Sequence, residues 1–245
     1  MQRALLFLSF IYFISCQPSF QIKVKNGHGY TVTDTMLTRP ERYMPFDAEA
    51  GYYICYIGPD TGRIAIGKPL RRYNIRDTHS CCVARTFGGN EMTIRVDTAA
   101  TQIQIEHFSL NHDTAGPYRI TDSIVPYRAM MVTLQNISDS AIYLGSHNFL
   151  KYMWLEIRNG KNEWIQLEKP SGWNSYCGTG APHNYLHPRD ILIAKFPQYE
   201  GEYTAEYRLV WQKPHQPKII SNEFVAPVNS FMLNVVELQI GGPRY

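Results

Sequence analysis

The sequence lacks the patterns that most directly assign a function to a chain. It has no G-x-S-x-G motif, Walker loop or dinucleotide fingerprint, so serine hydrolysis, nucleotide hydrolysis and dinucleotide chemistry have no support. Its net charge is only +3, and its Lys and Arg residues are spread along the chain. No basic block therefore indicates a nucleic-acid partner, and no acidic tail indicates a cation store.

Helical patterns are missing as well, because no stretch after residue 20 repeats its apolar residues with a sustained helical period. The chain does contain 44% hydrophobic residues, and its 17 tyrosines contribute to an aromatic content of 13%. The hydrophobic content supports a substantial core, and the aromatic content favours sheets. The length allows one large β domain or two modest ones.

Residues 22–120 are predicted to form a smaller, β-rich N-terminal region of short strands joined by loops. Within it, residues 51–66 contain two apolar runs around the turn-forming stretch GPDTG at 58–62, a pattern that predicts a hairpin. Residues 91–108 alternate apolar and polar positions over two stretches, which predicts strand structure.

Residues 121–245 are predicted to form an immunoglobulin-like β-sandwich, because about seven strands follow one another with turn residues between them. The strongest signal is a hairpin at 151–169, in which apolar positions alternate and Asn159-Gly160 supplies a dipeptide typical of tight turns. The other expected strands are 128–136, 141–145, 190–196, 202–211, 219–224 and 230–240.

The span from about Ile124 to Phe224, roughly two-fifths of the chain, resembles the Ig-like domain of uncharacterised lipoproteins of Gram-negative bacteria. The resemblance implies a fold and an exported address, and that family has no established activity to transfer. The residues that carry it are Val132-Thr133-Leu134, Asn136, Ser138, Trp164, Tyr176-Cys177-Gly178, Leu186, Pro188, Lys195, Tyr199, Gly201, Tyr203, Tyr207-Arg208-Leu209, Ser221-Asn222 and Phe224.

An apolar run, Ala4–Ile14, follows Arg3 at the start of the chain and is interrupted by no Lys, Asp or Glu. As a helix its 11 residues would extend about 17 Å, well short of the roughly 30 Å hydrocarbon core of a bilayer. The run is therefore predicted to be the apolar part of a signal peptide covering residues 1–15.

The junction Ser15-Cys16 resembles the lipobox of bacterial lipoproteins, although Phe13 stands where Leu is usual. That resemblance implies diacylglycerol on Cys16, which becomes the first residue of the mature chain, and residues 16–21 then form a short lipid-attached tether. Two or three acyl chains would hold the protein on a membrane permanently, whereas one chain binds only marginally. The alternatives are a plain secretory signal, which would make the protein secreted, and a retained short anchor.

Lipidation of Cys16 would leave an even number of cysteines in the folded part. These are Cys55, Cys81, Cys82 and Cys177. In an exported protein they are compatible with two disulfides, whose connectivity stays open. Cys81 and Cys82 could pair with each other only through a strained ring, so pairs of distant cysteines are favoured. A zinc site at these two residues and His79 lacks the C-x2-C spacing, so no metal site is expected.

Several polar groups are candidates for catalysis or metal binding. For each of them the alternative is that the residues have no chemical role and simply lie in loops or in the protein interior. His183 and His187 precede Asp190 and would share one face if they lay on a helix, but prolines bracket them. Cys177 with His183 contains a thiol and a base, without further protease signatures. A polar cluster comprises Glu106, His107, Asn111, His112 and Asp113. Asn136-Ile137-Ser138 is a glycosylation sequon that we interpret as a turn between strands.

Aromatic residues around the 151–169 hairpin could stack on sugars or peptides, with core packing as the alternative. They are Trp154, Trp164, Trp173, Tyr176 and Tyr185. We therefore expect an envelope-anchored, non-enzymatic β-sandwich that binds or scaffolds a glycan or protein and needs no cofactor. The alternative is an envelope hydrolase or carbohydrate-active enzyme with its site in residues 22–120.

Overall fold

The structure, a computed structural model, describes residues 22–25, 31–34, 42–43, 52–66, 88–111, 120–146, 149–168 and 183–233. These residues are mainly in strands, which confirms the predicted β class. The strands are β1 (Ile22–Lys25), β2 (Thr31–Asp34), β3 (Ile54–Pro59), β4 (Arg63–Ile66), β5 (Met92–Asn111), β6 (Ile120–Asn136), β7 (Ile142–Ser146), β8 (Met153–Arg158), β9 (Trp164–Gln166), β10 (His183–Leu186), β11 (Asp190–Pro197), β12 (Tyr203–Trp211), β13 (Ile219–Ile220) and β14 (Phe224–Val228).

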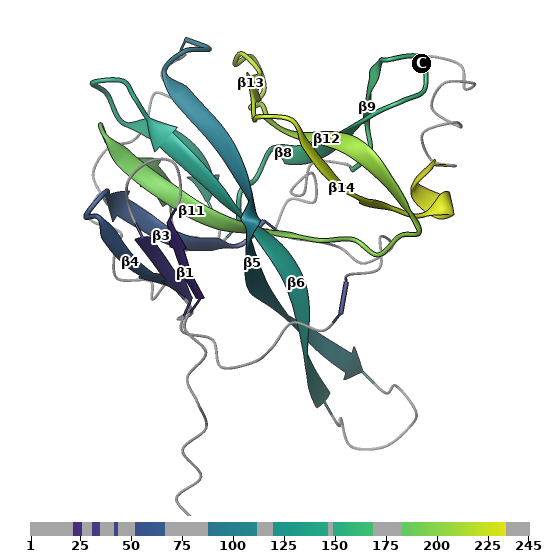
Figure 1. Cartoon of the computed structure of the whole chain (residues 1–245). Helices are drawn as coiled ribbons and strands as arrows, with labels where there is room; N and C mark the ends of the chain where they lie inside the picture. The colour runs from purple at the N-terminus through teal and green to yellow at the C-terminus, as the bar shows by residue number, and fades with distance from the viewer. Residues whose placement is uncertain are drawn as a thin grey trace, which may run out of the picture.

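The strands form three main sheets (Figure 1). The central sheet has the order β3-β11-β6-β5. The C-terminal sheet has the order β13-β12-β8-β9, and β14 also pairs with β12. The N-terminal sheet has the order β1-β2-β4, and a small fourth sheet joins β10 to β7. Strands from both sides of the predicted boundary at residue 120 therefore share the central sheet.

The two middle strands of the central sheet, β6 and β11, are buried on both faces. One face packs against the C-terminal sheet in a large core, to which Val132, Phe196 and Trp211 contribute. The other face packs Met131 and Ile193 against the N-terminal sheet in a second, smaller core. Every residue from 129 to 134 in β6 and from 191 to 197 in β11 is buried, and this explains their near-continuous apolar runs. The fold is thus a β-sandwich with a third layer.

The hairpin predicted around residues 58–62 is wrong. A turn does occur there, with Gly62 at φ 74° and its N–H donating to Asp60 Oδ1 at 3.2 Å. However, β3 pairs with β11 in the central sheet, and β4 pairs in parallel with β2 in the N-terminal sheet. Turn residues determine where the chain bends, whereas the two cores determine which strands pair.

The predicted hairpin at 151–169 is confirmed as the antiparallel pair of β8 and β9. Its turn differs from the expectation, because the positive φ falls on Asn162, at 66°, and Asn159 instead supplies a side-chain acceptor. The Oδ1 atom of Asn159 accepts hydrogen bonds from the backbone N–H groups of Lys161 and Glu163, at 2.9 and 2.8 Å. The result is a longer, internally hydrogen-bonded loop.

The strand predicted at 230–240 is wrong over its described part, because residues 230–233 form a helical turn. Asn229 begins this turn, and its Oδ1 accepts a hydrogen bond from the Met232 N–H at 2.8 Å. Met232 is fully buried in the large core. No helix in the part of the chain that the structure describes is long and apolar enough to cross a membrane.

Gly201, just before β12, lies against the backbone of Val228 and Asn229 so closely that a Cβ atom would overlap both. We expect Gly201→Ala to lower the free energy of unfolding by about 1–3 kcal/mol, because the ends of β12 and β14 must move apart. Urea denaturation measures this change. Gly160→Ala is the matched control, because no atom lies within 4 Å of its added Cβ. Equal stability of the two variants would contradict the close approach.

Candidate functional site

The solvent side of the C-terminal sheet gathers tryptophans and ionised side chains into what we call the charged face. It comprises Trp154, Glu156, Arg158, Trp164, Glu206, Arg208, Lys218 and Glu223. The period of two in β8 causes this arrangement, since Leu155 and Ile157 point into the core and Glu156 and Arg158 point away. Strand register then places Glu156 opposite Arg208 and Arg158 opposite Trp164.

Glu156 is the buried centre of the charged face, with its side chain only 6% exposed. Its Oε2 accepts from Arg208, at 2.7 Å from Nε and 2.6 Å from a terminal guanidinium nitrogen. Its Oε1 accepts from Trp154 Nε1 at 3.3 Å and lies 3.5 Å from Lys218 Nζ. The forked guanidinium contact offsets the cost of removing this carboxylate from water.

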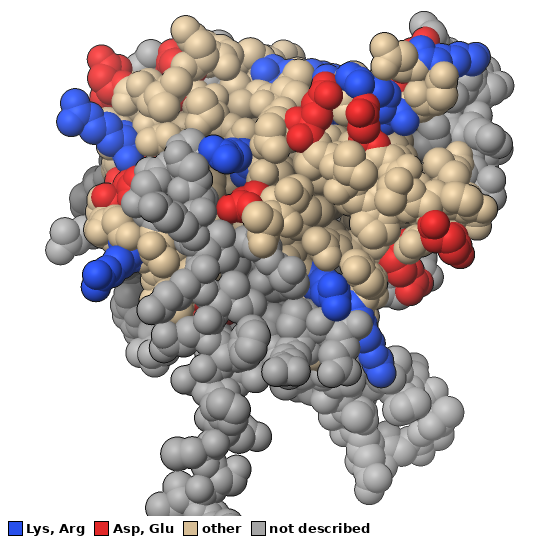
Figure 2. Space-filling view, in the orientation of Figure 1, with Lys and Arg blue, Asp and Glu red and all other residues tan. Residues whose placement is uncertain are grey.

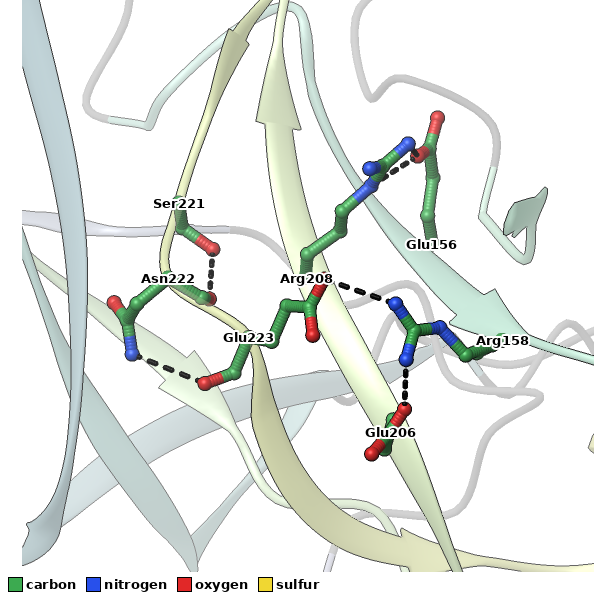
Figure 3. Close-up of polar contacts among 7 residues, drawn as sticks. All are labelled: Glu156, Arg158, Glu206, Arg208, Ser221, Asn222 and Glu223. Atoms are coloured by element: carbon green, nitrogen blue, oxygen red, sulfur yellow. Dashed lines mark hydrogen bonds and ion pairs between the residues drawn. The ribbon is translucent and has the colours of Figure 1, made fainter. Parts of the chain in front are cut away.

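Arg158 joins two glutamates that lie on neighbouring segments (Figure 3). Its guanidinium is 2.6 Å from Glu206 and 3.1 Å from Glu223. The same guanidinium carbon lies 4.7 Å from the ring centroid of Trp164, and that of Arg208 lies 4.3 Å from it. Two cations therefore contact one half-buried indole ring, a favourable cation–π arrangement.

The position of Glu223 is set by the segment between β13 and β14. Asn222 pairs with the backbone of Val96 in β5, accepting from its N–H at 2.8 Å and donating to its carbonyl at 3.2 Å. Ser221 Oγ accepts from the Leu209 N–H at 2.9 Å and donates to the Asn222 carbonyl at 2.7 Å. These bonds attach the loop to both sheets, so Glu223 is held in place next to Arg158.

The charged face is electrically balanced. Arg158, Arg208 and Lys218 supply three positive charges, and Glu156, Glu206 and Glu223 supply three negative charges. Basic and acidic side chains accordingly lie next to each other over the region of β12 and β13 (Figure 2). Such a surface offers fixed donors and acceptors with no net charge, which suits a polar, uncharged ligand better than a strongly ionic one.

A second polar group lies between the central and C-terminal sheets. The carboxylate of Glu168 accepts hydrogen bonds from the hydroxyls of Tyr52 and Tyr199, both nearly fully buried, and from the Leu155 N–H at 3.1 Å. Burial raises the pKa of Glu168 despite these hydrogen bonds, which favour the ionised form. Burial and the neighbouring Glu168 likewise raise the pKa of Tyr52. Sequence reasoning missed this cluster.

A third polar group lies between the central and N-terminal sheets. Lys195 Nζ is 2.9 Å from Asp34 Oδ2, with side-chain exposures of 5% and 1%. Nearby, Cys55 in β3 is a free thiol that contacts the Tyr53 carbonyl at 3.5 Å. Burial raises the pKa of Cys55 to about 11, with Lys195 lowering it and Asp34 raising it. A pKa in this range keeps the thiol protonated near neutral pH.

The other predicted cysteines, Cys16, Cys81, Cys82 and Cys177, lie outside the described residues, so lipid attachment and disulfide pairing stay predictions. The same holds for His79, His112, Asp113, Trp173 and Tyr176. Among the described residues, no group of three or more His, Cys, Asp or Glu side chains could hold a metal ion.

His183 and His187 are not on a helix: His183 begins β10, and His187 is exposed in the turn that follows. The two imidazoles therefore do not share a helical face. Tyr185 packs against Tyr143, with ring centroids 5.2 Å apart. Trp154 is only 6% exposed, so the packing alternative applies to it.

Asn136, the first residue of the sequon, is fully buried. Its side-chain amide donates to the Ser140 carbonyl at 2.7 Å and to the Leu186 carbonyl at 2.8 Å. Its Oδ1 accepts from the Ser138 N–H at 2.9 Å. The interpretation of this motif as a turn between strands is confirmed.

Two further features come from the N-terminal half. Glu106, His107 and Asn111 lie along β5. The outward side of the N-terminal sheet has a shallow hollow of about 400 Å³, lined by Thr31, Thr33, Arg63, Ile64 and Ala65.

No known family model, curated protein or solved structure matches this chain.

Proposed function

We propose that this protein is an exported, lipid-anchored β-sandwich of the bacterial cell envelope that binds a glycan without changing it chemically. The apolar run at 4–14 and the Ser15-Cys16 junction support the address and the anchor. The observation that carries the binding role is the charged face, where the Trp164 ring lies among paired guanidinium and carboxylate groups.

The chemistry of a sugar fits this surface. The apolar C–H side of a sugar ring packs on an indole, and its hydroxyls both donate and accept hydrogen bonds. Glu206 and Glu223, about half exposed at 47% and 51%, present acceptors. Arg158, whose side chain is 29% exposed, presents donors beside them.

The direct test is a glycan and peptidoglycan array probed with the chain lacking residues 1–16, followed by calorimetric titration of the strongest ligand. We expect Trp164→Ala to weaken binding about tenfold, because one aromatic contact contributes roughly 1.4 kcal/mol. Arg158→Gln should have a similar effect through lost hydrogen bonds.

Tyr203→Ala is the matched control, because Tyr203 is an aromatic residue of the same sheet, 58% exposed, and is not part of the charged face. It should bind like the parent chain. Failure to bind any glycan, or equal losses for Trp164→Ala and Tyr203→Ala, would rule out this role for the charged face.

A further inference from the structure

The N-terminal sheet has one buried side and one outward side, and they differ sharply in character. Val32 and Asp34 in β2 and Ile64 and Ile66 in β4 are buried against the central sheet. The period of two in each strand therefore puts the intervening positions on the outward side. Of these, Thr31 and Thr33 are half-buried, and Arg63 and Ala65 are exposed.

The register of β1 adds two basic positions to this outward side. Lys25 pairs with Thr31, which pairs with Arg63, and Lys23 pairs with Thr33, which pairs with Ala65. Two adjacent rows result, Lys25–Thr31–Arg63 and Lys23–Thr33–Ala65, which we call the basic face. It combines three basic residues and two hydroxyls with no acidic residue at these six positions.

Among the described residues, two acidic groups lie in or next to the strands of the N-terminal sheet. Asp34, the one carboxylate of the sheet's strands, is 1% exposed on the opposite side and forms the ion pair with Lys195. Asp60, in the turn before β4, accepts the Gly62 N–H at 3.2 Å. Unlike the charged face, the six positions of the basic face therefore carry basic residues and no acidic one.

The hollow of about 400 Å³ lies on this surface, and Arg63, Thr31 and Thr33 supply donors around it. Guanidinium and hydroxyl donors suit an anion that only accepts hydrogen bonds, and phosphate oxygens are such acceptors. The small side chain of Ala65 leaves room beside them. The basic face therefore suits phosphate groups that belong to an extended surface, because such a surface can lie against the whole sheet.

The position of the basic face along the chain indicates which kind of molecule carries the phosphate. β1 begins at Ile22, six residues after Cys16, and six extended residues span at most about 20 Å. A lipid on Cys16 would therefore hold the basic face close to the membrane surface. Attraction of basic residues to anionic lipids fades within a Debye length of about 8 Å, so the basic face must come nearly into contact with the membrane, which a tether of this length permits.

We propose that the basic face docks on the anionic phospholipid headgroups of the membrane that holds the anchor. This inference rests on the lipid attachment in the proposed function and adds a second, electrostatic membrane contact. It also orients the molecule, because the N-terminal sheet then faces the lipid and the C-terminal sheet lies on the far side of the central sheet (Figure 1).

The test uses the unlipidated mature chain, residues 16–245 with Cys16→Ser, in flotation with phosphatidylcholine vesicles that contain or lack one-quarter phosphatidylglycerol. We expect binding to the anionic vesicles only. Replacing Lys23, Lys25 and Arg63 by Gln should reduce the partition coefficient roughly hundredfold, about fivefold for each basic residue. Raising the salt to about 1 M should have a comparable effect, because the Debye length shrinks to about 3 Å.

The matched control carries the same loss of charge elsewhere, with Gln in place of the exposed Arg95, Lys161 and Arg189. It should bind nearly as the parent does. Equal binding to neutral vesicles, or equal losses in the two triple variants, would overturn the proposal. Binding to soluble dextran sulfate without binding to anionic vesicles would overturn the membrane assignment.

The anchor is tested separately in cells. Labelling of the parent, but not of Cys16→Ser, by a palmitate analogue supports the lipid attachment on which the inference rests. Absence of label would refute the anchor in the proposed function while leaving the vesicle result to stand on its own. If the parent is labelled in cells but the basic triple variant binds vesicles as well as the control triple variant does, the lipid anchor is supported and the docking role of the basic face is refuted.

Discussion

Replacing Lys195 by Met is expected to lower the free energy of unfolding by about 3–5 kcal/mol, because it removes the ion-pair partner of the buried Asp34 side chain. The two side chains are 5% and 1% exposed, and their charged atoms are 2.9 Å apart. The core around them is the smaller one, between the N-terminal and central sheets. Since whole domains are stable by only about 5–15 kcal/mol, the change is measurable by urea denaturation.

Two comparison variants separate the buried charge from the loss of one lysine. Lys161→Met, at an exposed turn position, should change stability by less than about 0.5 kcal/mol. The double variant Lys195→Met with Asp34→Leu should recover most of the loss, because neither charge is left alone. If Lys195→Met is as stable as Lys161→Met, the pair does not link the two layers as described.

Stability is expected to fall as pH rises above the usual carboxyl value of 4.5, and Glu168 is the expected cause. Burial raises the pKa of Glu168 in the folded chain, so between the unfolded and folded pKa values the folded state binds more protons than the unfolded state. The favourable contribution is complete below the unfolded pKa and is lost as pH passes the folded pKa. Urea denaturation at a series of pH values from 4 to 8 measures it.

Glu168→Gln should remove this pH dependence while keeping an acceptor for one of the two tyrosine hydroxyls and offering the amide NH2 as a donor to the other. Glu168→Ala should instead cost several kcal/mol, at about 1–3 kcal/mol for each buried donor left without an acceptor. The exposed Glu202→Gln is the control and should retain the parent's pH profile. A parent and a Glu168→Gln variant with the same slope against pH would refute the assignment to Glu168.

The sequence predicts the features of this fold that depend on neighbouring residues. The β8–β9 hairpin was predictable because its alternation and its turn-forming residues lie within one short stretch, although the geometry of the turn was not. The partners of β3 and β4 were not predictable. β3 pairs with β11, more than 130 residues later in the chain, and β4 pairs with β2 in a different sheet from β3. The apolar run of β11 predicts a strand, while its burial on both faces depends on the third layer.

The candidate sites divide in the same way. Trp164 was recognisable as an aromatic residue beside a hairpin, but its contacts with Arg158 and Arg208 arise from the register of three strands. Glu168 gave no signal at all, because a glutamate in a polar turn is ordinary until Tyr52 and Tyr199 meet it from another sheet. Such contacts depend on how distant strands pack together in the tertiary structure, which local sequence patterns do not encode.

The path of the chain through the layers has a consequence for how this protein can be divided. The chain leaves the N-terminal sheet after β2, adds β3 to the edge of the central sheet, and returns to the N-terminal sheet as β4. Removing residues up to 51 would leave β4 without β2, and removing residues up to 66 would also strip β3 from β11. The basic face and the sandwich are therefore interleaved in one chain, and neither can be exchanged as a separate module without rebuilding the other.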